Sequence, residues 1–134
     1  MTELGHVLVV EDDGILAMAL ADALTAVGYD VVGPAPTTKK ALKLIETETI
    51  DAALLDVNLG SEHVDGVAQA LANADIPFVF STGYCSKSAL PPAFANQMTL
   101  NKPYQTDQLL KVISKLVSAG QAARADAAGT VKTQ

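Results

Sequence analysis

Four polar groups, each within two residues of the end of a short apolar run, are the residues of this sequence whose types suggest chemistry. They are the acid pair Glu11 and Asp12, the lone carboxylate Asp56, the hydroxyl of Thr82 and the ammonium group of Lys102. Carboxylates brought together repel one another, by roughly 4 kcal/mol for two charges 4 Å apart at an effective dielectric near 20. A hard cation such as Mg2+ removes that conflict, because it prefers oxygen ligands.

The same residues fit the transfer of a phosphoryl group. Beside a divalent cation that neutralises the phosphoryl oxygens, the carboxylate of Asp56 can act as a nucleophile and form an acyl phosphate. Lys102 offers a compact positive charge to a phosphoryl oxygen, and Thr82 offers a hydroxyl donor. We therefore expect a phosphoryl-accepting site whose cofactor is Mg2+.

Each of these residues has a structural explanation when it is taken alone. Asp56 fits a turn, Lys102 a surface charge and Thr82 the cap of a following turn. Asp13 fits the N-cap of a helix better than a metal ligand. The occurrence of all four groups at the ends of apolar runs, in this order, is what favours a common site.

Five apolar runs would position these groups at one edge of a sheet. The runs are residues 7–10, 31–32, 52–55, 77–80 and 98–100. Helical patterns lie between them, and strands that alternate with helices predict a parallel sheet covered on both faces. In such sheets ligands bind beyond the carboxyl ends of the strands. The expected fold class is therefore α/β, a doubly wound five-stranded parallel sheet with about five helices.

Two segments do not follow the regular pattern. Pro91-Pro92 lies in the segment 85–97, and because proline breaks a helix interior, the fourth helix should be short or mobile. Apolar periodicity is strong from Leu109 to Val117 and stops near Ser118. We expect one domain over residues 4–118 and a mobile tail over residues 119–134.

Composition limits the class of protein. The chain has 134 residues and a net charge of −6, whereas a protein that binds nucleic acid would present a basic face. Cys85 is its one cysteine, which excludes an internal disulfide. The sequence shows neither a signal-peptide pattern nor an apolar run long enough for a membrane span. We expect a cytoplasmic protein with no nucleic-acid or membrane partner.

These motifs together resemble the receiver domain of bacterial two-component response regulators. The resemblance covers residues 6–117 and is carried by short segments at the strand ends. They are Val7-Leu8-Val9-Val10-Glu11-Asp12, Leu54-Leu55-Asp56-Val57-Asn58, Asp65-Gly66, Ser81-Thr82-Gly83 and Lys102-Pro103. The resemblance implies the flavodoxin-like strand order 2-1-3-4-5.

The resemblance also implies a role for each site residue. Asp56 corresponds to the phosphoacceptor, Glu11 and Asp12 to the acid pair that holds Mg2+, and Asn58 to the residue whose backbone carbonyl completes the metal site. Thr82 and Lys102 correspond to the switch hydroxyl and to the lysine that pairs with the phosphoryl group.

A histidine kinase would donate the phosphoryl group, and a downstream protein or phosphotransferase would receive the signal by protein contact. The protein would thus be a phosphorelay switch rather than an enzyme, a monomer or weak dimer. No output domain follows residue 117, which favours a stand-alone receiver.

The sequence departs from the family pattern at the switch. Receivers usually carry Tyr or Phe three residues before the lysine, where this chain has Thr99, and Tyr84 is a candidate substitute. Phe80-Ser81-Thr82-Gly83-Tyr84 resembles a subgroup with the motif Phe-x-Thr-Gly-Tyr. Members of that subgroup are mostly single-domain receivers, associated with histidine kinases of the HWE and HisKA2 types.

Three alternatives stay open at the level of sequence. A flavodoxin-like cofactor-binding module would need a phosphate loop after the first strand, where this chain has acidic residues 11–13. A degenerate receiver would act as an interaction domain without phosphorylation. An aspartate-nucleophile phosphatase would usually carry a second aspartate two residues after the nucleophile, where this chain has Asn58.

Overall fold

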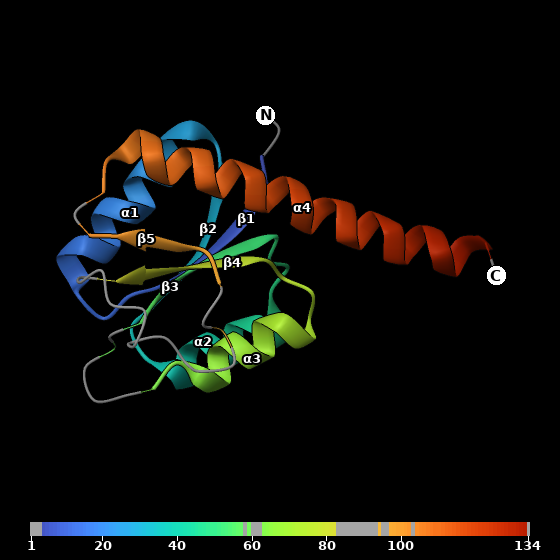
Figure 1. Cartoon of the computed structure of the whole chain (residues 1–134), viewed down its shortest axis with the longest axis horizontal. Helices are drawn as coiled ribbons and strands as arrows, with labels where there is room; N and C mark the ends of the chain where they lie inside the picture. The colour runs from blue at the N-terminus through green and yellow to red at the C-terminus, as the bar shows by residue number, and fades with distance from the viewer. Residues whose placement is uncertain are drawn as a thin grey trace.

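The computed structural model describes residues 4–57, 59, 63–82, 94, 97–102 and 104–133. Strands and helices alternate along these residues (Figure 1). In chain order they are β1 (His6–Val10), α1 (Gly14–Val27), β2 (Asp30–Ala35), α2 (Thr38–Thr47), β3 (Ala52–Asp56), α3 (Asp65–Asn73), β4 (Phe78–Thr82), β5 (Thr99–Asn101) and α4 (Thr106–Thr133). Among them, no helix is long and apolar enough to cross a membrane.

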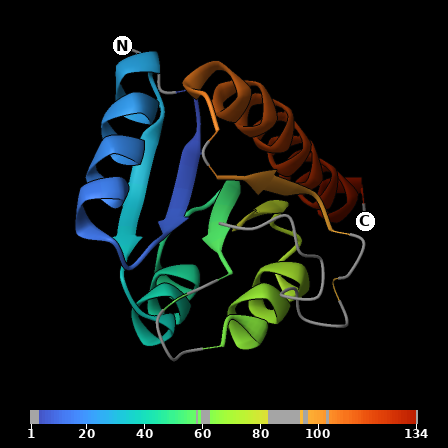
Figure 2. The ribbon, with the colours of Figure 1, turned by 60° about the vertical axis from the view of Figure 1, so that its left-hand side comes forward.

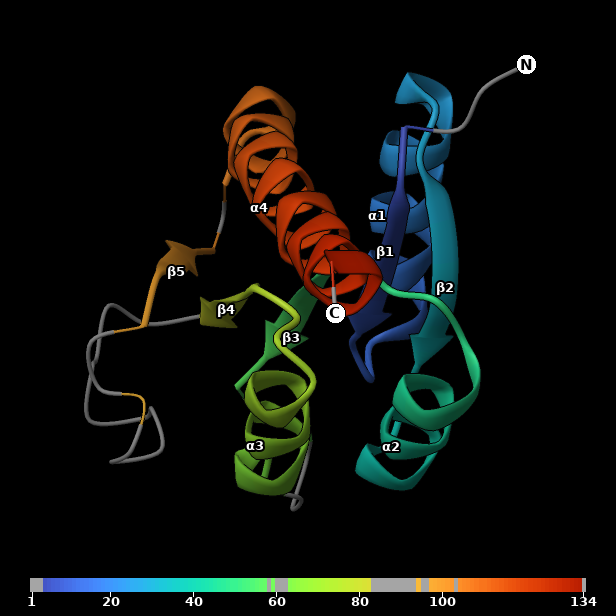
Figure 3. The same ribbon diagram turned by 90° about the vertical axis from the view of Figure 1, so that its right-hand side faces the viewer.

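The strands form one parallel sheet in the order β2-β1-β3-β4-β5. Helices α1 and α4 cover one face and α2 and α3 the other, as Figures 2 and 3 show. The predicted doubly wound order 2-1-3-4-5 is confirmed. The described residues include four helices, and the predicted short fourth helix over 85–97 lies almost entirely outside them.

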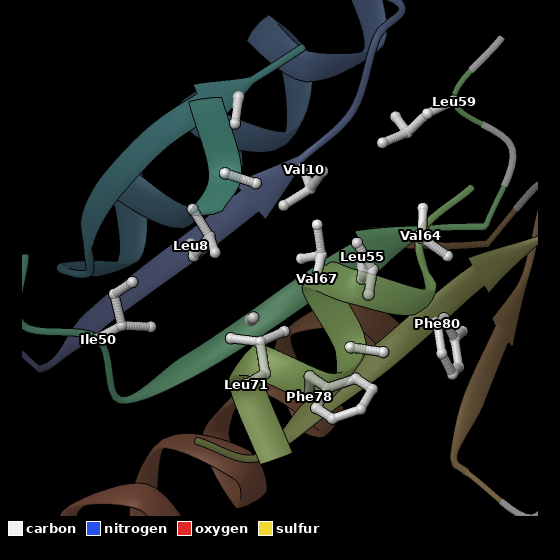
Figure 4. Packing of buried hydrophobic residues seen from close by; sticks show 14 of the residues in the cluster. Leu8, Val10, Ile50, Leu55, Leu59, Val64, Val67, Leu71, Phe78 and Phe80 are labelled. Carbon is white, nitrogen blue, oxygen red and sulfur yellow. The ribbon is translucent and has the colours of Figure 1, made fainter. Parts of the chain in front are cut away.

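Alternate residues of each central strand belong to two separate cores. Leu8, Leu55 and Phe80 face α2 and α3 in the core drawn in Figure 4. Leu54 and Val79 face α1 and α4 in the second core. Because both faces of these strands are buried, their sequences are continuous apolar runs rather than alternating patterns.

Local sequence fixes where α1 begins and ends. The Asp13 carboxylate accepts hydrogen bonds from the backbone N–H groups of Ile15 and Leu16 at 3.0 and 3.1 Å, which confirms it as the N-cap. Gly28 ends the helix with φ of 121°, a conformation that favours glycine. Asp12, one residue before the cap, therefore lies at the carboxyl edge of the sheet, between β1 and α1.

Strand β2 is longer than the sequence predicted, because it continues through Gly33 and Pro34 to Ala35. It is an edge strand and pairs on one side only. Proline has no backbone N–H to donate, and it is tolerated in an edge strand because one side of that strand makes no hydrogen bonds to a neighbouring strand. Its pairing with β1 shifts register between Leu8 and Val10, which accommodates the extra residue.

The last helix continues beyond the predicted domain boundary at residue 118, since α4 runs to Thr133. The mobility expected of residues 119–134 stays a prediction. The continuation of α4 is held by Asp51, a buried residue just before β3. Arg124 Nη2 lies 2.6 Å from Asp51 Oδ1, and the amide of His6 donates to Asp51 Oδ2 at 2.7 Å. A Cβ at position 120 would overlap the Asp51 carbonyl, so Gly120 permits the close approach. These contacts involve a charged side chain and a glycine rather than apolar residues, so no apolar periodicity marks this part of the helix in the sequence.

Gly120→Ala should lower the free energy of unfolding by about 1–3 kcal/mol, the usual cost of overpacking. Intrinsic helix propensity predicts the opposite sign, a gain of about 1 kcal/mol. Urea titration of the variant distinguishes the packing effect from the propensity effect. Ser118→Ala, at an exposed position of the same helix, is the control. Stabilisation by Gly120→Ala would contradict the packing of α4 against Asp51.

Candidate functional site

The site lies at the carboxyl edge of the sheet, where four neighbouring strands end. Glu11 follows β1, Asp56 and Thr82 are the last residues of β3 and β4, and Lys102 follows β5. Asp12 stands next to Glu11 and one residue before the cap of α1. Parallel pairing therefore brings together residues that are up to 91 positions apart in the sequence.

Three carboxylates form the centre of the site. Glu11, Asp12 and Asp56 each place an oxygen within 4.8 Å of the others. Glu11 and Asp56 are buried, with 3% and 2% of their surface exposed, whereas Asp12 is exposed. Two carboxylates in such an environment require a compensating charge.

Lys102 supplies a positive charge to both buried carboxylates. Its Nζ lies 3.3 Å from Glu11 Oε1 and 3.3 Å from Asp56 Oδ2. Burial acts to lower the pKa of Lys102, but the negative charges of Asp56 and Glu11 outweigh it and raise the pKa. The ammonium group is therefore charged at neutral pH. The backbone N–H of Lys102 donates to the carbonyl of Thr82 at 2.7 Å, which holds this residue against β4.

One positive charge does not compensate two carboxylates fully. Burial raises the pKa of Glu11 to about 7, and a hydrogen bond with Asp56 and the charge of Asp56 act in the same direction. The backbone N–H of Asp13, which donates to Glu11 Oε2 at 3.2 Å, and the charge of Lys102 act to lower it. An all-oxygen donor set with excess negative charge matches the preference of Mg2+.

The remaining predicted residues lie at different places. Thr82 is buried at the end of β4, beside the end of β3. Thr99 begins β5 and is partly buried. It pairs with Phe80, and each of these residues lies two positions before the end of its strand. Asn58 and Tyr84 lie outside the described residues, so their predicted roles at the metal site and the switch stay predictions.

Two buried hydroxyls near the site were missed by the sequence analysis. Ser81 is 1% exposed and pairs in register with Asp56, and Tyr104 follows Lys102 by two residues. The only signal in the sequence was their position beside residues already chosen, because Ser and Tyr in a buried segment carry no distinctive spacing.

A pocket of about 330 Å³ adjoins the acid cluster. Its lining comprises Glu11 and Asp12 together with small or apolar residues of α1, of the end of β2 and of the segment after it, among them Ala17 and Met18. Met18 is 66% exposed, so the pocket has an apolar side chain at the surface of α1.

Comparison with known proteins agrees with this geometry. The family described as response regulator receiver domain matches residues 7–114. The chain belongs to this family. The receiver is 29% identical over 122 residues to the phyllosphere-induced regulator PhyR of Methylorubrum extorquens, covering 89% of this chain and 46% of PhyR. It is 29% identical over 116 residues to the transcriptional regulatory protein PdtaR of Mycobacterium tuberculosis, covering 84% of this chain and 57% of PdtaR. The receiver thus spans about half the length of these curated relatives.

Solved structures show the same fold. The solution structure of SdrG from Sphingomonas melonis Fr1 is 42% identical, with a TM-score of 0.73 over 87% of this chain and 99% of that chain. A CheY-like receiver from Methanospirillum hungatei JF-1 is 24% identical with a TM-score of 0.77, over 90% of this chain and 99% of that chain. This second likeness concerns the fold alone.

Asp12→Asn should raise the melting temperature in a buffer with chelator, because it removes one like charge from the cluster. It should also reduce the rise produced by Mg2+, which at ten times its dissociation constant would stabilise the wild type by about 1.4 kcal/mol. Thermal unfolding with and without Mg2+ measures both effects. Asp22→Asn, the same charge change at an exposed position of α1, is the control. An undiminished Mg2+ effect in Asp12→Asn would argue against Asp12 as a ligand.

Proposed function

We propose that this receiver accepts a phosphoryl group on Asp56 from a histidine kinase and passes the signal on by protein contact. The observation that carries the proposal is the buried pair Glu11 and Asp56, bridged by Lys102 at 3.3 Å on each side. Burying two carboxylates beside one lysine costs stability, so their presence here supports a functional role. Family membership supports the same function.

In the proposed reaction a carboxylate oxygen of Asp56 attacks the phosphorus of a phosphohistidine. The O–P bond forms as the N–P bond breaks, and the imidazole nitrogen of the donor keeps the electron pair. Mg2+, when bound by Glu11, Asp12 and Asp56, would neutralise negative charge on the transferring oxygens. The backbone carbonyl of Asn58 is the further ligand that the family resemblance suggests.

Lys102 would change partners during this reaction. In the structure its ammonium group is shared between two carboxylates, and phosphorylation attaches to one carboxylate oxygen of Asp56 a phosphoryl group with three acceptor oxygens. A phosphoryl oxygen then becomes the stronger partner. Thr82, at the end of the adjacent strand, would donate its hydroxyl to the same group.

The partners follow from the family and from charge. A net charge of −6 supports a protein partner rather than nucleic acid. The Phe-x-Thr-Gly-Tyr motif at residues 80–84 supports a kinase of the HWE or HisKA2 type, with a downstream protein or phosphotransferase as receiver of the signal. We further propose a monomer or weak dimer that works as a switch rather than as an enzyme.

The alternatives are less well supported. A flavodoxin-like module would bind phosphate where this chain presents Glu11 and Asp12, whose negative charges oppose it. A degenerate receiver would have lost members of the acid cluster or the lysine, and here both are in place. A phosphatase would need an acid/base residue where the chain has Asn58.

Incubation with acetyl phosphate and Mg2+ should add the mass of one phosphoryl group to the intact protein. Asp56→Asn should gain none, because an amide is not a nucleophile for phosphorus under these conditions. Asp65→Asn, an exposed aspartate at the start of α3, should behave like the wild type. Intact mass spectrometry reads all three proteins. A degenerate receiver would gain no mass in any of them.

A further inference from the structure

Two buried hydroxyl groups lie behind the acid cluster without hydrogen-bond partners. The hydroxyl oxygens of Ser81 and Tyr104 are both inaccessible to solvent, and neither is hydrogen-bonded within the described part of the chain. Leaving such a group unpaired opposes folding, so buried polar atoms usually have a partner. Two unpaired hydroxyls beside a site that changes its charge therefore call for a functional explanation.

Sheet geometry directs Ser81 and Asp56 to the same face. The two residues are paired in register on the adjacent parallel strands β4 and β3. Val79 and Leu54, two residues earlier on each strand, both pack in the core beneath α1 and α4. Because side chains alternate along a strand, Ser81 and Asp56 point to that face as well. Tyr104 packs against the same core.

Tyr104 responds to the charges of the site. Burial raises the pKa of its phenol, the nearby Ser81 hydroxyl and the charge of Lys102 act to lower it, and the charges of Glu11 and Asp56 raise it. The two hydroxyls are thus near enough to influence one another, but neither completes a hydrogen bond within the described part of the chain. Each can donate and accept, so a small rotation would connect them.

We propose that phosphorylation of Asp56 closes a chain of hydroxyls, in which Tyr104 donates to Ser81 and Ser81 donates to the acyl phosphate. This inference rests on the proposed function of Asp56. In the described state the carboxylate of Asp56 is bound to Lys102. A phosphoryl group draws the lysine away and adds acceptor oxygens, which gives the buried hydroxyls the partner that they lack. Linked hydrogen bonds also reinforce one another in a buried environment.

The chain of hydroxyls would carry the state of the site to α4. Tyr104 lies two residues after Lys102 and two before the first residue of α4, Thr106. A fixed phenol would therefore order the junction between β5 and α4. Receivers generally place an aromatic switch residue where this chain has Thr99, and Tyr104 would supply an aromatic hydroxyl from the other face of the sheet. Tyr104 and Ser81 act here as positioning residues.

Fluorine NMR of protein labelled with 3-fluorotyrosine tests the inference. The chain has three tyrosines, so the Tyr104 resonance is assigned by its loss in Tyr104→Phe. Acetyl phosphate with Mg2+ should move this resonance by more than its linewidth, and the shift should be lost in Ser81→Ala. Tyr29, buried in the same core but located before β2 at the opposite edge of the sheet, is the internal control and should not move.

Intact mass measured on the same samples separates this inference from the proposed function. A gain of one phosphoryl group with an unmoved Tyr104 resonance would overturn the hydroxyl chain and leave phosphorylation intact. A shift of equal size in phosphorylated Ser81→Ala would also overturn it, because Tyr104 would then respond without Ser81. No gain of mass in the wild type would refute the proposed function and the inference together. An unchanged Tyr29 resonance in Ser81→Ala shows that the variant is folded.

Discussion

The bridge from Lys102 to the two buried carboxylates of Glu11 and Asp56 joins the ends of β1, β3 and β5 at the site. Two like charges with 3% and 2% exposure are tolerated because one ammonium group lies 3.3 Å from each. Even so, burial and the neighbouring Asp56 raise the pKa of Glu11 to about 7. The arrangement therefore supports the proposal that a cation and a phosphoryl group bind here, each of which would change the partners of Lys102.

The fold makes this bridge possible by its topology. Parallel strands end at a common edge, and the order β2-β1-β3-β4-β5 places the ends of β1, β3 and β4 next to one another with β5 completing the row. Each strand is buried on both faces, so its direction and register are fixed by two cores rather than one. Asp56 and Ser81 lie on the face of the sheet that the second core covers, and Tyr104 packs against that core, so the proposed hydroxyl chain would connect Asp56 with the start of α4.

Sequence analysis succeeded where a residue follows a strongly constrained element. The runs 7–10 and 52–55 are apolar at every position because both faces are covered, and this predicted the positions of Glu11 and Asp56. It failed where contacts do not depend on periodicity. Helix α4 continues past residue 118 because Gly120 and Arg124 meet Asp51, and β2 extends through Pro34 because it lies at the edge. Ser81 and Tyr104 were missed because their importance depends on register and burial.

We propose that this geometry directs a phosphoryl group to one of three carboxylates whose oxygens lie within 4.8 Å of one another. Reduction of the phosphorylated protein with borohydride converts an aspartyl phosphate into homoserine, and peptide mass spectrometry locates it. We expect homoserine at position 56 and unmodified residues at positions 11 and 12. A reduced residue at Glu11 or Asp12, with Asp56 unchanged, would contradict it.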